Sequence, residues 1–275
     1  MSALTTIVIT NDVARAALAV RAGVARIMVD LEVDGKAERQ PAGSLISAHS
    51  FDDISAIRAA VPQAGLIVRI NPVGGNTPRE VEEAITRGAD FIMLPMVKTA
   101  EEMQRVKTLI AGRAKLIPLI EHIDALNNAE AILDAGADEA YLGLNDLHLS
   151  LHQQFMFEPL VEGLVDRFAR AARERAMPFG FGGVGKIGSG QLPAEAIIGE
   201  HARLGSTRVI ISRAFDRALD AAGAATDSDY IQGVSDIFAA YGAAQMRSEH
   251  QVQAEHVATI RAIRQVAASL AARAS

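Results

Sequence analysis

The chain has 275 residues and a net charge of −6 that is spread along its length, so it can form one large domain or two small ones. It contains no cysteine, which excludes a thiol nucleophile, a disulfide framework and a thiolate metal site. It also lacks a basic run, an apolar run of membrane-spanning length and the basic region of a signal peptide. We therefore expect a cytoplasmic protein that binds neither nucleic acid nor membranes.

Eight short apolar runs predict β-strands, in the order Thr6–Ile9, Arg26–Val29, Leu66–Ile70, Phe91–Leu94, Leu116–Ile120, Glu139–Leu142, Pro178–Phe181 and Arg208–Ile211. Helical patterns separate the runs, and several of these helices end in a glycine, as in RAGVARIMVD and RGADFIMLP. The runs are continuous rather than alternating, which is typical of strands buried on both faces. These eight βα repeats predict an α/β fold, the (β/α)₈ TIM barrel. The alternative is a doubly wound open sheet, which the lack of a G-x-G-x-x-G motif after the first run disfavours.

The C-terminal part of the chain is longer than an eighth βα repeat requires. We predict a catalytic barrel over residues 1–240 and a C-terminal helical extension over residues 241–275. The extension carries an apolar stripe at helical spacing, formed by Val257, Ile260, Ile263 and Val266. Either this stripe packs on the outer helices of its own barrel or it packs on another subunit. We favour the second arrangement, in which the extension is an oligomerisation element and the protein is a homo-oligomer.

Two acidic residues follow neighbouring strands in the middle of the chain. Residues 116–149 are predicted to form strand, helix and strand, with Glu121 directly after the first strand and Asp146 just past the second. Because parallel strands of a βαβ unit lie side by side, both carboxylates emerge at one edge of the sheet. Two hard oxygen donors in this arrangement suit Mg²⁺ or Mn²⁺. The alternative is one solvated loop acid and one helix-capping acid.

Long loops follow two of the predicted strands. Residues 32–53 contain His49, and a loop of this length in a compact barrel is typical of a lid or a site loop. Residues 182–193 are rich in glycine and follow the seventh strand, where barrels often bind phosphate, so a phosphate or CoA contact is one interpretation and a plain turn is the other. Residues 146–166 are predicted to be a third loop, with His148 near its start.

Four motifs resemble the metal-dependent class II pyruvate aldolases, the hydroxy-oxo-heptanedioate aldolase and citrate lyase β-subunit family. They are VRINP (68–72), GADFIMLPMVKTAEE (88–102), LIEHIDALNNAEAI (119–132) and YLGLNDLHLSL (141–151). The resemblance covers roughly residues 5–215. It implies a (β/α)₈ barrel, often assembled as a trimer or hexamer with exchanged C-terminal helices, which cleaves or forms carbon–carbon bonds through a metal-bound enolate of pyruvate or of an acyl-CoA.

The resemblance also implies roles for individual residues. The metal ligands would be Glu121 and Asp146, and Arg69 would bind the 2-oxo oxygen and the enolate. In the motif YLGLNDLHLSL, the backbone N–H groups of Gly143, Leu144 and Asn145 would help to hold the substrate carboxylate. Two positions depart from the aldolase pattern, because Leu119 replaces a glutamine and His122 replaces a threonine.

We therefore predict a metal-dependent carbon–carbon lyase that acts on a small hydroxy-2-oxo acid through a pyruvate enolate. His49 is the first candidate for the base, because only histidine titrates near neutrality without perturbation, and His122 and His148 are the alternatives. Arg69 has a second interpretation as a buried ion-pair partner of Asp30 or Glu32. Two other functions stay open at this point, a citryl-CoA or malyl-CoA lyase that acts on a CoA thioester and a non-catalytic barrel subunit.

Overall fold

Eight parallel strands close into one barrel in chain order, as predicted. The computed structural model describes residues 3–34, 49–221, 223 and 225–274. The strands are β1 (Thr5–Ile9), β2 (Arg26–Asp30), β3 (Gly65–Arg69), β4 (Phe91–Leu94), β5 (Lys115–Ile120), β6 (Ala140–Leu142), β7 (Phe179–Val184) and β8 (Arg208–Ile211). Each of the eight predicted runs overlaps one of these strands. The largest difference is at β7, which continues to Val184 through a register shift against β8.

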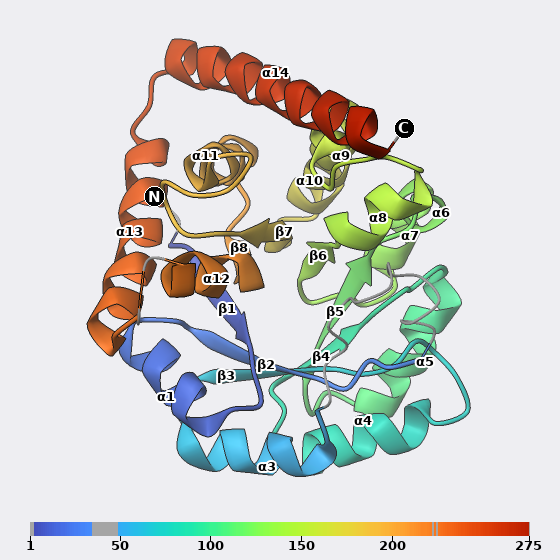
Figure 1. Ribbon diagram of the computed structural model, residues 1–275. Coiled ribbons are helices and arrows are strands. Elements are labelled where there is room, and N and C mark those ends of the chain that lie inside the picture. The colour runs from blue at the N-terminus through green and yellow to red at the C-terminus, as the bar shows by residue number, and fades with distance from the viewer. Residues whose placement is uncertain (1–2, 35–48, 222, 224, 275) are drawn as a thin grey trace.

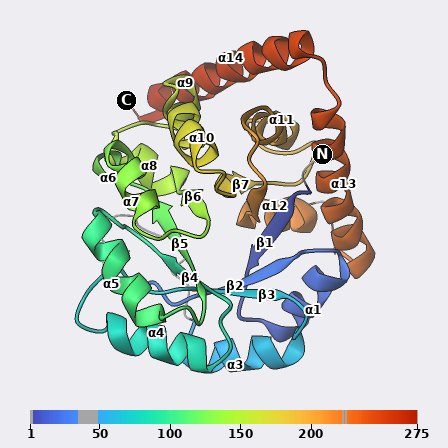
Figure 2. The ribbon, with the colours of Figure 1, turned by 180° about the vertical axis from the view of Figure 1, so that it is seen from behind.

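Helices surround the barrel on its outside (Figures 1 and 2). They are α1 (Val13–Arg21), α3 (Phe51–Ala60), α4 (Thr77–Thr86), α5 (Ala100–Ile110), α6 (Ile123–Asn127), α7 (Ala129–Asp134), α8 (Leu144–Ser150), α9 (Glu158–Val161), α10 (Leu164–Glu174), α11 (Ala194–Leu204), α12 (Arg213–Ala221), α13 (Asp227–Gln245) and α14 (Glu249–Ala274). Residues 146–166 differ from the predicted loop, because most of the segment lies in α8, α9 and the start of α10. Asp146 therefore belongs to the first turn of a helix, where an acidic side chain interacts favourably with the helix dipole.

Alternation along each strand divides the apolar core into two parts. One side chain of a pair such as Ile7 and Val8 enters the barrel and the next faces the helices. The inner part is a small cluster that fills the barrel, formed by Ile7, Met28, Ile67, Phe91, Met93, Ile117, Leu119 and Tyr141. The outer part is much larger and lies between strands and helices. The filled interior leaves the rim at the strand ends as the place where polar groups can gather.

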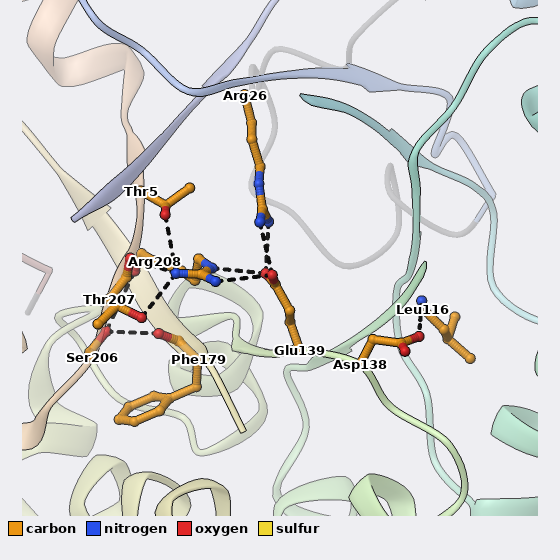
Figure 3. A network of polar contacts seen from close by, with 9 residues as sticks. All are labelled: Thr5, Arg26, Leu116, Asp138, Glu139, Phe179, Ser206, Thr207 and Arg208. Atoms are coloured by element: carbon orange, nitrogen blue, oxygen red, sulfur yellow. Dashed lines mark hydrogen bonds and ion pairs between the residues drawn. The ribbon is translucent and has the colours of Figure 1, made fainter. Parts of the chain in front are cut away.

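A buried ion cluster closes the barrel at the ends where the strands begin (Figure 3). Glu139, directly before β6, accepts two hydrogen bonds from Arg26 at 2.7 and 2.8 Å and two from Arg208 at 2.9 and 3.0 Å. Burial raises the pKa of Glu139, but the hydrogen bonds and charges of the two arginines outweigh this and lower the pKa to about 2. Both carboxylate oxygens are satisfied twice, so the cluster joins β2, β6 and β8 at the closed end.

Replacing Glu139 by Gln should lower the free energy of unfolding by about 3 kcal/mol, because it leaves two arginines without their counter-charge. The folded-state pKa lies below the ordinary value of 4.5, so the ionised carboxylate stabilises the protein above about pH 4.5 and this contribution is lost as the pH falls toward about 2. Denaturant unfolding from pH 7 to pH 2.5 should show a smaller loss of stability in Glu139→Gln than in the wild type. An identical pH dependence of both proteins would contradict the assignment.

The two C-terminal helices lie outside the ring of βα repeats. α13 packs against α1 and α11, and α14 crosses α9 and α11 of its own chain. Ile263 is completely buried by this packing, whereas Val257 is 47% exposed, so the barrel covers only part of the predicted stripe. The predicted boundary between residues 240 and 241 falls inside α13. Oligomerisation through the extension stays a prediction, which light scattering on the intact protein would test. Across the described residues, none of the helices is long and apolar enough to cross a membrane.

Candidate functional site

Glu121 and Asp146 lie together at the ends where the strands finish, opposite the Glu139 cluster. Glu121 directly follows β5, and Asp146 stands in the first turn of α8 after β6. Both side chains are buried. Gly143 connects β6 to α8, and its N–H donates to the Ile120 carbonyl at 2.8 Å. The structure therefore brings together the two acids that the sequence predicts to meet.

The close approach of Gly143 to Glu121 explains why a glycine occupies this position. A Cβ atom at Gly143 would lie 2.8 Å from Glu121 Oε2 and 2.9 Å from Glu121 Cβ, closer than such atoms pack. The Gly143 N–H was expected to hold a substrate carboxylate. In the structure it donates to the Ile120 carbonyl instead. Leu144 and Asn145 are the first two residues of α8, where backbone N–H groups have no partner within the helix.

The charge around Glu121 is predominantly negative. Burial, Asp146 and Glu32 raise its pKa, while Arg69 and a backbone N–H lower it, and the result is a pKa of about 8. That N–H belongs to Met96, and it donates to Glu121 Oε1 at 2.9 Å. Met96 has a φ of 49°, a left-handed conformation that costs energy for a residue with a side chain. The sequence carries no signal for this contact, which holds one oxygen of Glu121 in place.

Arg69 is the last residue of β3 and lies beside Asp30 of β2 in the barrel register. Its guanidinium donates to both oxygens of Asp30, with Nε at 2.8 Å and an Nη at 2.7 Å, and Nε is 3.4 Å from a Glu32 oxygen. Burial lowers the pKa of Arg69, but the hydrogen bond to Asp30 and the charges of Asp30 and Glu32 raise it by more. The net pKa is above its usual value, so the guanidinium is always charged. Arg69 is thus an ion-pair partner of both acids, as its second interpretation proposes, and it also acts on Glu121.

The three candidate histidines use their Nδ1 atoms in different ways, and these bonds indicate the tautomers. His49 Nδ1 accepts the Asp30 N–H at 2.9 Å, so a neutral His49 carries its proton on Nε2. His122 Nδ1 caps α6 by accepting the Asp124 N–H at 3.2 Å. His148 Nδ1 lies 3.1 Å from the Leu144 carbonyl and can bond to it only as a donor. His49 is therefore tied to the residue that holds Arg69.

The glycine-rich segment after β7 satisfies several of its polar groups internally. The Gly188 N–H donates to Glu195 at 2.9 Å, and the Ser189 hydroxyl donates to the Lys186 carbonyl at 2.6 Å. These bonds are those of a closed turn, and the predicted phosphate or CoA contact stays a prediction. Most of the other long loop, residues 35–48, lies outside the described residues.

The acids at this rim fit a divalent cation by their chemistry. Glu32, Glu121 and Asp146 are buried oxygen donors, and the charge of Arg69 lowers the pKa of Glu121 less than burial and the two neighbouring acids raise it. Such a surplus of buried negative charge is costly unless a cation compensates it. Nowhere in the described part of the chain do three His, Cys, Asp or Glu side chains group tightly enough to hold a metal by themselves. Two carboxylates with the remaining positions left to water and substrate match the preference of Mg²⁺.

A filled (β/α)₈ barrel with polar groups at the C-terminal strand ends has the architecture of a barrel enzyme. The HpcH/HpaI aldolase/citrate lyase model matches residues 8–174, and the chain belongs to this family.

Solved structures with the same fold include two members of this family. An HpcH/HpaI aldolase from Desulfitobacterium hafniense is 18% identical, with a TM-score of 0.64 over 80% of this chain and 91% of that one. An HpcH/HpaI aldolase/citrate lyase family protein from Burkholderia cenocepacia is 17% identical, with a TM-score of 0.62 over 81% and 95%. Among curated proteins, the pyruvate kinase of Agrobacterium vitis is 29% identical over 121 residues, which are 44% of this chain and 24% of the kinase. The chain thus spans about a quarter of that relative.

Replacing Gly143 by Ala should displace the Glu121 carboxylate and cost about 1–3 kcal/mol of stability, because the new methyl group overlaps it. We expect the folded variant to bind Mn²⁺ more weakly than the wild type in a titration followed by electron paramagnetic resonance. Gly75→Ala is the matched control, since a Cβ there meets nothing within 4 Å. Unchanged Mn²⁺ affinity in folded Gly143→Ala would show that Glu121 does not hold the cation.

Proposed function

We propose that this member of the lyase family is a metal-dependent aldolase that cleaves or forms a small hydroxy-2-oxo acid. Glu121 and Asp146 would hold Mg²⁺ or Mn²⁺, and Arg69 would bind the 2-oxo oxygen. The observation that carries the proposal is the pair of buried carboxylates beside a charged guanidinium at the barrel rim. The matched kinase is named for pyruvate, which is the oxo acid that this reaction would release.

The reaction breaks the bond between the hydroxyl-bearing carbon and the carbon next to the ketone. A base takes the hydroxyl proton, an aldehyde forms, and the electrons of the broken bond move onto the 2-oxo oxygen as an enolate. Protonation of the enolate carbon then gives pyruvate, and the reverse sequence forms the bond. A cation bound by the two acids supplies a Lewis acid for the developing negative charge.

Arg69 is suited to stabilise the same negative charge. Its guanidinium has five N–H donors, and Asp30 takes two of them through its two oxygens. The bidentate ion pair fixes the plane of the group before substrate arrives, so little reorganisation accompanies the reaction. The remaining donors would then be available to the 2-oxo oxygen, whereas a lysine would present one point charge without this fixed plane.

His49 is our candidate for the base, because its Nδ1 accepts the backbone N–H of Asp30, the residue whose carboxylate holds Arg69. To accept a proton at Nδ1 the ring would have to release the Asp30 N–H. His49 would then carry the hydroxyl proton and could later donate it to the enolate carbon.

Deuterium exchange into pyruvate tests the function and the metal ligands together. The wild type with Mg²⁺ or Mn²⁺ in D₂O should deuterate the methyl group of pyruvate, and EDTA should stop the exchange. Glu121→Gln and Asp146→Asn should each abolish exchange and weaken Mn²⁺ binding, because an amide lacks the charge that holds a hard cation. Glu130→Gln, an exposed acid on α7, is the control and should behave as wild type. Exchange into pyruvate that persists in EDTA would contradict the proposal. If the enzyme is offered acetyl-CoA in the same assay and deuterates acetyl-CoA but not pyruvate, the proposal is also contradicted, and a CoA thioester lyase is indicated.

His49→Ala should slow carbon–carbon cleavage far more than it slows the decarboxylation of oxaloacetate. Both reactions produce the same enolate, but decarboxylation takes no proton from a hydroxyl group, so the comparison isolates the base. The measurement is kcat for both reactions on the same protein preparation. Equal losses in the two reactions would show that His49 acts through its bond to Asp30 and not as the base.

A further inference from the structure

Asn71 connects three segments at the rim through one side chain. Its Oδ1 accepts the N–H groups of Val33 at 2.8 Å and Asp34 at 3.0 Å, in the chain that leaves β2. Its Nδ2 donates to Glu80 Oε1 at 2.9 Å, and its own backbone N–H donates to Glu80 Oε2 at 2.9 Å. Every polar atom of the Asn71 side chain is therefore engaged.

Glu80 is a buried carboxylate on α4. One of its oxygens accepts from the Asn71 backbone N–H and the other accepts from the Asn71 side-chain amide. The two parallel bonds fix the Asn71 amide in one orientation, with its nitrogen toward Glu80 and its oxygen toward Val33. Burying a carboxylate is costly unless its hydrogen bonds are made. The pair joins the end of β3 to α4, and through Asn71 Oδ1 it also reaches the chain after β2, which lies beyond the paired register of the β2–β3 ladder.

The connection lies beside the ion pair of Arg69. The paired register of β2 and β3 ends at Asp30 and Arg69, and one more backbone bond runs from the Leu31 N–H to the Arg69 carbonyl at 2.9 Å. Beyond that point Asn71, two residues after Arg69, holds Val33, the residue after Glu32. The side chain of Asn71 thus continues the cross-link past the end of the sheet.

We propose that Asn71 and Glu80 are a positioning pair for the reaction, which keeps Asp30 and Glu32 in register with Arg69. The inference rests on the proposed function, because the pair affects the reaction only if Arg69 binds the substrate as proposed. Without the pair, the chain after β2 can shift relative to β3, and the Glu32 carboxylate near Arg69 shifts with it. Neither residue touches the reacting atoms, so both act through the orientation of the guanidinium.

The chemistry of the pair allows an exchange of the two functional groups. In Glu80→Gln one oxygen becomes an NH₂ group that faces an N–H donor, and in Asn71→Asp two carboxylates face each other. In the double variant Asn71→Asp with Glu80→Gln, the glutamine oxygen accepts the backbone N–H of residue 71 and the glutamine NH₂ donates to the aspartate. The other aspartate oxygen still accepts from Val33 and Asp34. The double variant keeps both the net charge and every hydrogen bond of the wild type.

We expect each single variant to lower kcat by up to about 10²-fold, the loss that a misplaced catalytic group produces, with a smaller change in KM. The double variant should recover most of kcat, a coupling that a double-mutant cycle measures directly. Glu82→Gln is the matched control, since Glu82 is an exposed acid on the same helix that pairs with Arg113 at 2.9 Å. All rates are taken at a temperature where circular dichroism shows each protein to be folded. Losses that simply add in the double variant, or single variants with wild-type kcat, would overturn the proposal.

Amide hydrogen exchange separates this proposal from the proposed function. The N–H groups of Val33 and Asp34 should exchange faster in each single variant and return to wild-type rates in the double variant, whether or not the protein turns over pyruvate. If the wild type does not exchange pyruvate while the amides respond in this way, the proposed function has failed and the cross-link stands. Amides that exchange at wild-type rates in all the variants would refute the cross-link itself.

Discussion

Closure of eight parallel strands in chain order is the constraint on which the rest of this molecule depends. It sends every residue that follows a strand to one rim of the barrel and every residue that precedes a strand to the other. Arg69, Glu121 and Asp146 are distant in sequence, yet each stands at or just beyond the end of a strand. The barrel interior is filled with apolar side chains, so charged groups can gather only at the two rims.

The two rims resolve their charge in opposite ways. At the rim where the strands begin, one acid, Glu139, is shared by two arginines, and its pKa falls to about 2. At the other rim Glu121 has two acidic neighbours and one arginine, and its pKa rises to about 8. The first arrangement pairs both carboxylate oxygens with arginines and stabilises the fold. In the second, the raised pKa keeps the Glu121 carboxyl protonated near neutral pH unless a cation compensates its charge. This difference in charge distinguishes a structural cluster from a candidate active site within one chain.

Hydrogen bonds at or just beyond the strand ends give the rim its definite geometry. The Met96 N–H holds Glu121, the Asp30 N–H holds His49, and Asn71 holds the chain after Glu32. Met96 and Asn71 lie in segments that the β-ladder no longer constrains, whereas Asp30 is the last residue of β2 and still pairs with Arg69. A site built in this way is positioned by the barrel and oriented by the loops, and the loops can change without disturbing the core.

The sequence by itself determined the barrel, the eight strands to within a few residues and the meeting of Glu121 with Asp146. These follow from periodicity, from glycines that end helices and from the rule that parallel strands finish at one edge, all of which are local or nearly local. Only the tertiary structure decided that Gly143 spends its N–H on Ile120 and that Met96 adopts a left-handed conformation for Glu121. It alone also decided that Asn71 links Glu80 to Val33. These contacts depend on the angles and distances between elements, which the closed barrel sets and no pattern of residue types encodes.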